Sequence, residues 1–452
     1  MDSDSLFRRA FELERLGRTD DAKAAYRDLI ARDPAHAGAH NNLARLLHRE
    51  GAKHDARELL EHVVDSAPSD AMARANLGIV LFELELFDEA RACLLAALSL
   101  DPSSRLAHLG LARIFAIEGN DAASLEHQRA ALGSAAISVS GTGPLGDRAP
   151  RLLLLASEEQ LGATSGEWLA ATDFAIATLI VERFQDDLAL PLHHAVFNTI
   201  SDADRNAVAL ERARRILTHA TVPVVNPPDA VLATARTALA QRLHGLADVV
   251  VPATHAFARD ARVPDVGWPL LLRAPGFHSG QHFVRVDQPG ELAAALAQLP
   301  GDELLAIQAL PAQSVDGLFR KYRMMFVDGT LYPMHAAISN HWKVHYFSAE
   351  MVQHPERRAE DAAYLASPQH VLGARAMRAL EAIEGRLGLD YGGIDFALDA
   401  NGRVLVFEAN ATMTVPAPPA GSQWDYRRAP VARILEATRE MLQRRARAGG
   451  WK

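Results

Sequence analysis

The chain of 452 residues is too long for one ordinary hydrophobic core, so about three domain-sized units are expected. Its composition, 49% hydrophobic and 23% charged, is globular, and its net charge of -9 argues against general nucleic-acid binding, which needs a positive surface. No run approaches the roughly 18 apolar residues of a membrane span, and the first residues lack a basic-then-apolar signal. The single Cys93 excludes an intramolecular disulfide and a cysteine-cluster zinc site, which predicts a reducing, cytoplasmic location.

A repeat of 34 residues occupies the first third of the chain. Prolines, small residues, large apolar residues and turn glycines each recur at this interval: Pro34, Pro68 and Pro102; Ala22, Ala56 and Ala90; Tyr26, Leu60 and Leu94; Ala44, Gly78 and Ala112; Gly17, Gly51 and Gly119. The small residues permit close approach of two helices, and each proline ends the second helix of a pair. The pattern predicts stacked helix hairpins.

This pattern resembles the tetratricopeptide repeat over residues 3–132, with three clear copies and a degenerate fourth in which Ala136 replaces the proline. We expect an all-α solenoid over residues 1–135. The resemblance implies a concave groove that binds a peptide or protein partner. The alternative is that the array packs on the rest of its own chain or forms a homodimer.

A linker is expected over residues 136–150, where Gly, Ser and Pro are frequent. A small parallel α/β layer is expected next, over residues 151–228, because short β-rich runs alternate with longer segments. The runs cover residues 151–157, 177–184, 194–201 and 222–228.

Further helices and strands are expected in the remaining half of the chain. Helices are predicted over residues 231–246, 291–299 and 430–446, strands around a glycine loop within 267–286, another strand over 304–310, and hairpins over 321–338 and 392–410. The arginines of the last helix are expected to mark a solvated face.

The hairpin at 392–410 brings two acids together. Asn401-Gly402 favours a two-residue loop, which pairs Ala400 with Arg403 and, further out, Asp395 with Glu408. The same register pairs apolar residues on the other face: Leu398 with Leu405, Phe396 with Phe407, and Ile394 with Ala409.

Opposed like charges are destabilising, so the two acids need a compensating charge. A divalent cation would supply it, and Asn410, two residues beyond Glu408, adds a neutral oxygen that suits Mg²⁺. The alternative is a solvent-facing strand whose acids splay apart into water.

Basic residues and a glycine loop precede the hairpin. Arg273 ends a strand and is followed by a loop that contains Gly276, Ser279 and Gly280, which together form a weak phosphate-binding signal. The strand at 304–310 runs out of apolar residues at Gln308, and Arg323 and Lys343 follow.

In this order the elements resemble the ATP-grasp superfamily over about residues 150–445. The resemblance implies a multidomain chain whose α/β part has the small layer, one α+β subdomain over 229–308 and a second over 309–452. It implies ATP and one or two Mg²⁺ as cofactors. The implied roles are metal binding by Asp395, Glu408 and Asn410; nucleotide binding by Arg236, Arg273, Gly276, Ser279, Gly280, Gln308, Ala309, Leu310 and Lys321; and catalysis by Arg323 and Lys343.

Two departures from the family pattern concern arginines. The family usually has lysines where Arg236 and Arg273 stand, and Arg242 is a second candidate for the first of these positions. Arginine keeps the positive charge but is bulkier, so the substitution is not neutral. The family glycine often found after Asn410 is also missing, so the acceptor side is not transferable.

The resemblance implies an ADP-forming carboxylate-amine ligase that acts through an acyl phosphate. Because a peptide-binding type of array precedes the ligase-like part, a peptide or protein substrate is expected, and maturation of a ribosomally made peptide is one such activity. One alternative is a ligase for small amino acids whose repeats serve oligomerisation. Another is a non-catalytic adaptor with a degenerate nucleotide fold.

Histidines near Lys343 have open roles. His341 and His345 lie four residues apart and a metal pair is imaginable, but packing or polar substrate contacts are favoured because no third ligand is evident. His335 and Asn340 are candidate acceptor-site contacts, and His278 is expected to belong to a mobile lid.

Overall fold

The computed structural model describes residues 2–118, 120–133, 135–140, 148–159, 174–185, 188–275, 280–344, 351–413, 415, 417–418 and 421–451. The predictions for Gly119, Gly276, His278, Ser279 and His345 concern residues outside these ranges. The chain divides into a helical unit, residues 1–149, 158–164 and 171–175, and an α/β unit, residues 150–157, 165–170 and 176–452.

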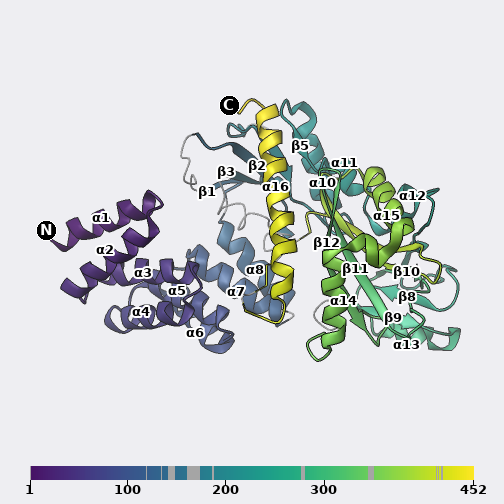
Figure 1. The fold of residues 1–452 in the computed structure, drawn as a ribbon, viewed down its shortest axis with the longest axis horizontal. Coiled ribbons are helices and arrows are strands. Elements are labelled where there is room, and N and C mark those ends of the chain that lie inside the picture. The colour runs from purple at the N-terminus through teal and green to yellow at the C-terminus, as the bar shows by residue number, and fades with distance from the viewer. Residues whose placement is uncertain are drawn as a thin grey trace. The chain divides into compact units, whose positions relative to one another are not determined.

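The helical unit consists of helices in successive hairpins (Figure 1, purple to blue). Its elements are α1 (Ser3–Arg15), α2 (Thr19–Arg32), α3 (Ala37–Arg49), α4 (Lys53–Ser66), α5 (Ala71–Glu83), α6 (Phe87–Leu100), α7 (Arg105–Ile117), α8 (Asp121–Leu132) and the strand β1 (Ile137–Ser140). Each helix packs on the next, from α1 on α2 to α7 on α8. The repeat prediction is therefore confirmed, and β1 lies in the segment predicted as a linker.

Small residues of the repeat make room for one large side chain. Leu94 of α6 is fully buried and lies between Gly78 of α5 and Gly110 of α7. A Cβ atom on Gly78 would lie 2.6 Å from Leu94 Cγ, and one on Gly110 would lie 2.7 Å from Leu94 Cδ1. Three helices therefore meet at a contact that tolerates no methyl group at either glycine without movement.

Left-handed residues join the two helices of a hairpin. Gly17 has a φ of 73° and Gly51 a φ of 88°, as expected for glycines that end a helix. Glu85, which stands at the same position of the next repeat, has a φ of 63°. Glu85 thus adopts the left-handed conformation that the repeat requires at this position, although its side chain makes that conformation sterically unfavourable.

The first sheet of the α/β unit contains strands β2 (Arg151–Ala156), β3 (Ala175–Ile180), β4 (Ala195–Asn198) and β5 (Val224–Val225), in the order β3-β2-β4-β5. β2 pairs with β4 and β4 with β5, both in parallel, which confirms the predicted layer. The helices α10 (Ala207–Ile216), α11 (Pro228–Leu232) and α12 (Arg236–Arg242) follow β4 along the chain. The single helix predicted over 231–246 is wrong, because Ala235 is extended and separates α11 from α12.

A second sheet has the order β7-β10-β8-β9. Its strands are β7 (Thr254–Ala258), β8 (Leu270–Arg273), β9 (Phe283–Val286) and β10 (Glu303–Gln308), with helix α13 (Leu292–Ala297) after β9. Every pairing described in it is antiparallel.

A third sheet has the order β12-β11-β13-β14-β6 (Figure 1, green). Its strands are β6 (Val249–Val250), β11 (Phe319–Val327), β12 (Thr330–Ser339), β13 (Tyr391–Leu398) and β14 (Val404–Ala411); the helices are α14 (Pro355–Ala366), α15 (Pro368–Leu387) and α16 (Arg428–Ala448). Asp328 and Gly329, both with positive φ, form the predicted turn between β11 and β12.

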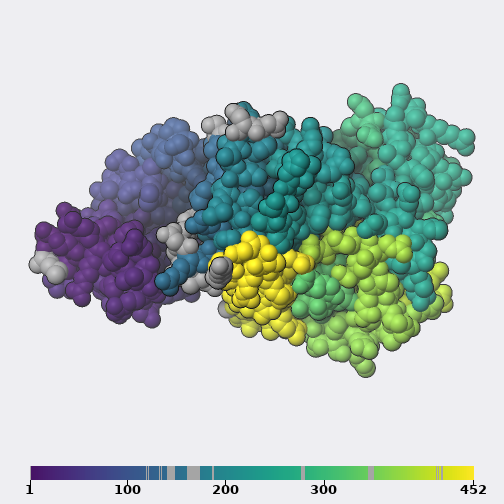
Figure 2. Space-filling model, turned by 90° about the horizontal axis from the view of Figure 1, so that it is seen from above, coloured from purple at the N-terminus to yellow at the C-terminus, as the bar shows by residue number. Residues whose placement is uncertain are grey.

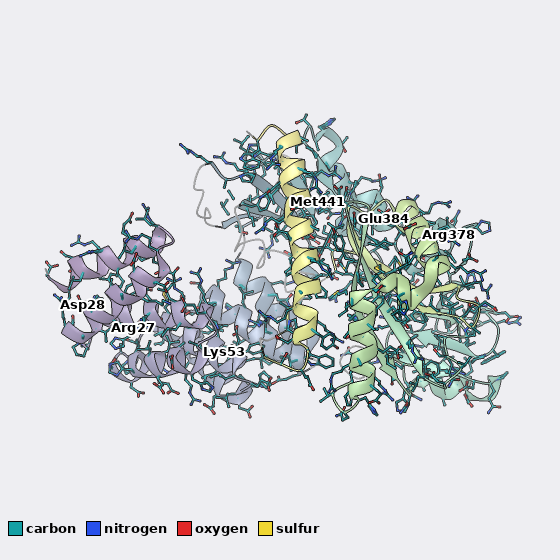
Figure 3. The ribbon with its side chains drawn as sticks, in the orientation of Figure 1. Arg27, Asp28, Lys53, Arg378, Glu384 and Met441 are labelled. Atoms are coloured by element: carbon teal, nitrogen blue, oxygen red, sulfur yellow. The ribbon has the colours of Figure 1, made fainter. Side chains whose placement is uncertain are left out.

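Helix α16 joins two sheets of the α/β unit. It contacts β11 and β12 of the third sheet and β4 and β5 of the first, and its Met441 is fully buried (Figure 3). Part of the C-terminal segment, in yellow, is exposed on the face shown in Figure 2. Its arginines are not all solvated, because Arg445 binds Asp390 at 2.7 Å and Asp328 at 2.8 Å. Of the described helices, none combines the length and apolar character that crossing a membrane requires.

The acid hairpin has an unexpected turn. Gly402 N donates to Asp399 O and Asp399 N donates to Arg403 O, both at 3.0 Å, and Gly402 has a φ of 74°. The loop is therefore one residue longer than the predicted two-residue turn, because the Asp399 carboxylate accepts from the backbone N–H of Asn401 and of Arg403.

A bulge on β14 reverses the shift that this loop introduces. The predicted pairs of Leu398 with Leu405 and Phe396 with Phe407 are wrong, since Leu398 pairs with Val404 and Phe396 with Val406. Beyond the bulge, Asp395 faces Glu408 and Ile394 faces Ala409, as predicted. The acid pair is confirmed, although the turn argument that led to it is not.

Candidate functional site

One cavity of about 230 Å³ in the α/β unit is lined by residues from both the second and the third sheet. Predicted site residues in its lining are Arg236, Arg273, Gly280, Gln308, Ala309, Leu310, Lys321, Arg323, Lys343, Asp395 and Glu408. Asn410 is half-buried opposite Gly393 and lies outside the described lining. The fold thus brings together residues that are up to 172 positions apart, such as Arg236 of α12 and Glu408 of β14.

A row of polar residues crosses the third sheet. His335 on β12 pairs with Arg323 on β11, Arg323 pairs with Asp395 on β13, and Asp395 pairs with Glu408 on β14. Directly opposed residues in a sheet share a face, so the row places a cation between His335 and the acid pair.

Asp395 lines the cavity and is 1% exposed. Arg323 holds it with two hydrogen bonds, Nε to Oδ1 at 2.6 Å and Nη2 to Oδ2 at 2.9 Å, and Lys321 Nζ lies 3.0 Å from Oδ2. Burial opposes ionisation of this carboxyl, but Arg323 and Lys321 outweigh it and hold its pKa well below 3.8. Asp395 is therefore a carboxylate in the folded protein.

Glu408 is held by a residue from outside the sheet. Arg236 Nη2 donates to its Oε2 at 2.9 Å, while Arg236 Nη1 donates to Asp204 Oδ2 at 2.6 Å. Burial and the neighbouring Asp395 raise the pKa of Glu408, but Arg236 and Lys321 lower it further, so it lies below its usual value.

Asp204 was not predicted as a site residue. It also accepts from the backbone N–H of Arg236 at 3.1 Å, and so fixes the start of α12 as well as the guanidinium. Asp204 could have been predicted from its position in the loop that follows β4. Parallel sheets bind ligands at the carboxyl ends of their strands.

These contacts change the argument for a metal. The acid pair does not depend on a metal for compensation, because Lys321, Arg323 and Arg236 supply it. The donors remain hard oxygen atoms, which fit Mg²⁺ or Mn²⁺, and no protein partner is described for Glu408 Oε1. Among the described residues, no group of three His, Cys, Asp or Glu side chains could hold a metal.

Two further cations, Lys343 and Arg273, line the cavity and influence each other. Lys343 Nζ donates to the carbonyl of Phe283 at 3.3 Å, and its pKa is lowered by burial and by nearby Arg273. The pKa of Arg273 is lowered by its own burial and by Arg236. Lys343 has no carboxylate partner among the described residues. This cluster of like charges costs free energy that a bound anion would recover.

An aromatic contact joins β9 to the segment that follows β12, next to Lys343. Trp342 packs edge-on against Phe283 with ring centroids 5.3 Å apart. Gly280, with a φ of 73°, leaves space for the Lys343 side chain, since a Cβ atom there would lie 2.7 Å from Lys343 Cε. The backbone of Gly280 itself thus approaches the Lys343 side chain closely.

The remaining wall of the cavity is apolar. It includes Val251, Leu271, Ile307 and Leu310, next to Gln308 at the end of β10. Gln308 binds Ala253 through its backbone N–H, at 2.9 Å, and through its side-chain oxygen, at 3.2 Å. A flat apolar ring with polar edges fits this combination of side chains.

The candidate acceptor residues lie elsewhere. His335 is 3% exposed and its pKa is well below 6.5, because burial and Arg323 disfavour the charged form. Asn340 accepts from Arg357 at 2.9 Å, and His341 N donates to Ser339 Oγ at 3.1 Å. None of the three lines the described cavity.

Comparison with known proteins identifies the helical unit. The family model of the tetratricopeptide repeat matches residues 7–71 and 75–138. The N-terminal region therefore carries tetratricopeptide repeats, a module whose stacked helices form a surface for protein partners. The family match ends before the α/β unit begins, and no curated protein matches the chain.

Solved structures give weaker matches. The structure of MamA 41-end from Desulfovibrio magneticus RS-1 is 24% identical over 29% of this chain and 74% of that chain, with a TM-score of 0.27. TTC0263, a thermophilic TPR protein in Thermus thermophilus, is 20% identical over 29% of this chain and 73% of that chain, also with a TM-score of 0.27.

Proposed function

We propose that the protein is an ATP-dependent, ADP-forming carboxylate-amine ligase whose repeats recruit a peptide or protein substrate. The observation that carries this proposal is the charge of the cavity. Its lining has two acidic and seven basic side chains, the latter being Arg236, Arg273, Arg285, Arg320, Lys321, Arg323 and Lys343. In a chain with a net charge of -9, this concentration of basic side chains favours a polyanionic ligand, although Arg236, Arg285 and Arg320 also pair with acids outside the lining.

The nucleotide is expected to lie along the cavity. The apolar wall and the backbone of Ala309 and Leu310 would hold the base, and Arg273 and Lys343 the phosphates. Arginine at position 273 can bind phosphate oxygens in pairs, so the departure from lysine retains the chemistry. The cavity's arrangement of a ring-sized apolar wall beside clustered cations supports this orientation.

The acid pair would hold Mg²⁺, with Asn410 as the next donor along β14, and the metal would neutralise phosphate charge. Arg323 lies beside Asp395 and would stabilise the transferred phosphoryl group and the acyl phosphate. Phosphoryl transfer depends on positioning and charge neutralisation, so no protein nucleophile is required. The proposal therefore assigns no chemical role to Cys93.

The repeats support the substrate class. Tetratricopeptide arrays bind protein segments, and here such an array is fused to a unit whose cavity is rich in basic side chains. A peptide carboxylate or amine is accordingly the proposed substrate. Ligation of small amino acids, with the repeats serving oligomerisation, is the narrower version.

A second function is favoured by a different observation. Both acids are already paired with basic side chains, as expected if the cavity no longer binds a nucleotide and the protein is an adaptor. The repeat match alone supports a protein-interaction role of this kind.

Calorimetry with Mg-ATP separates these functions. The ligase proposal predicts Mg-dependent nucleotide binding that is lost in Asp395→Asn and Glu408→Gln, and ADP release when a panel of peptides and amino acids is added. No Mg-dependent nucleotide binding by the unmodified protein would leave only the adaptor. If ADP is released, turnover of peptides but not of single amino acids would support a peptide substrate.

A further inference from the structure

The acid pair is occupied by protein cations. Both oxygens of Asp395 are engaged, Oδ1 by Arg323 and Oδ2 by Arg323 and Lys321. One oxygen of Glu408 is engaged by Arg236. A divalent cation that approached this pair alone would have to displace these contacts and would meet the other cations of the cavity.

The two acids are held differently. Arg236 has a second carboxylate partner, Asp204, at 2.6 Å, so it stays paired when it leaves Glu408. Arg323 and Lys321 share Asp395 as their described carboxylate partner. Release of Asp395 would therefore leave two cations without a counter-charge inside the protein unless an anion arrives.

A polyanion supplies that counter-charge. Phosphate oxygens in the cavity would attract Lys321 and Arg323 and free the oxygens of Asp395, while Arg236 remains on Asp204. The cation then gains both carboxylates and the phosphates as ligands. Each ligand removes the obstacle to the other, which is thermodynamic coupling between two ligands of one site.

We propose that the acid pair binds a divalent cation only together with a polyphosphate, because Lys321, Arg323 and Arg236 close it to the free metal. This inference rests on the proposed function for the identity of the ligand. It makes Asp204 a positioning residue, which keeps Arg236 paired while Glu408 turns to the cation.

Titration of the full chain with Mn²⁺, followed by electron paramagnetic resonance of the free ion and corrected for the Mn²⁺ that the anion binds without protein, tests the coupling. The dissociation constant of Mn²⁺ should fall at least about tenfold when a non-hydrolysable ATP analogue is present, equivalent to a coupling of about 1.4 kcal/mol. The same factor should appear in the affinity for the analogue when Mn²⁺ is added. Equal Mn²⁺ affinity with and without the analogue overturns the inference.

Two lysine variants provide a matched pair. Lys321→Gln and Lys343→Gln each remove one positive charge from the cavity, but only Lys321 contacts Asp395. We expect free Mn²⁺ to bind several-fold more tightly to K321Q than to K343Q, while both variants lose affinity for the analogue. Equal affinity of the two variants for free Mn²⁺ means that the contact does not close the site, and overturns the inference.

Tripolyphosphate distinguishes this inference from the proposed function. If tripolyphosphate raises Mn²⁺ affinity as the analogue does, the coupling holds through phosphate alone. If tripolyphosphate promotes Mn²⁺ binding and ATP analogues do not bind, the nucleotide function fails while the coupling stands. If the analogue binds and Mn²⁺ affinity is unchanged by either anion, the coupling fails while the nucleotide function stands.

Discussion

The helical unit and the α/β unit differ in the sequence separation and the burial of their ion pairs. In the helical unit, ion pairs join neighbours along one helix, as in the exposed pair of Arg32 with Asp28, or join adjacent repeats, where they are partly buried. In the α/β unit, Asp204, Arg236 and Glu408 come from distant parts of the chain and meet inside the protein. Local repetition thus builds a scaffold, whereas long-range topology concentrates charge in one place. Buried charges destabilise a fold, and they are found mainly where a function requires them.

Removing a buried cation should produce the largest difference between the units. Arg323→Met removes one of the two cations described as pairing with the buried Asp395 and leaves Lys321. The free energy of unfolding should therefore fall by about 3 kcal/mol. Arg32→Met, which breaks an exposed pair, should cost less than about 0.5 kcal/mol. Urea unfolding of both variants, with hydrogen exchange to locate the loss, makes the measurement. Similar losses would contradict the comparison.

The scaffold should instead be sensitive to packing. Leu94→Ala removes the side chain that lies between Gly78 and Gly110, and we expect a loss of about 2–3 kcal/mol confined to the helical unit. The exposed Leu95→Ala is the control, with a loss below about 1 kcal/mol. Hydrogen exchange should show faster opening of α5, α6 and α7 in L94A. Equal destabilisation of the α/β unit in L94A would contradict the claim that the effect is confined to the helical unit.

Acidification should affect the buried row of the third sheet. The folded pKa of His335 lies well below 6.5, so the unfolded chain takes up a proton that the folded protein excludes. The stability due to neutral His335 is present above pH 6.5 and is lost as the pH falls towards the folded value, by roughly 1.4 kcal/mol at pH 5.5. The difference between the protein and His335→Gln, measured by urea unfolding at pH 7.5 and 5.5, isolates this effect. The same pH dependence in both would refute it.

The smallest effect concerns a turn of the scaffold. Glu85 adopts a left-handed conformation where equivalent positions hold Gly17 and Gly51. Glu85→Gly relieves this strain but increases the entropy of the unfolded chain, so we expect a net gain of roughly 0.5 kcal/mol. Thermal unfolding should show a small increase in melting temperature, and Glu50→Gly, at a right-handed position, should show a decrease. A lower melting temperature for E85G would mean that side-chain contacts outweigh the strain.

Much of the α/β fold followed from the sequence where the signal was local. The strands around 270–286, the turn at Asp328-Gly329 and the C-terminal helix lie where periodicity and turn chemistry predicted them. The helix predicted over 231–246 failed because a distant carboxylate, Asp204, binds the backbone N–H of Arg236 and helps to start a new helix there. Periodicity contains no information about such a partner.

The acid pair shows most directly which features follow from the sequence and which from the tertiary structure. The sequence by itself determined the repeat, because each small or turn residue recurs at a fixed interval and acts on its neighbours. It also determined that Asp395 and Glu408 lie on adjacent strands of one hairpin. Only the tertiary structure decided the bulge that restores their register and the identity of their partners. Those partners come from other strands and another layer of the fold, and burial strengthens the electrostatic interactions among them.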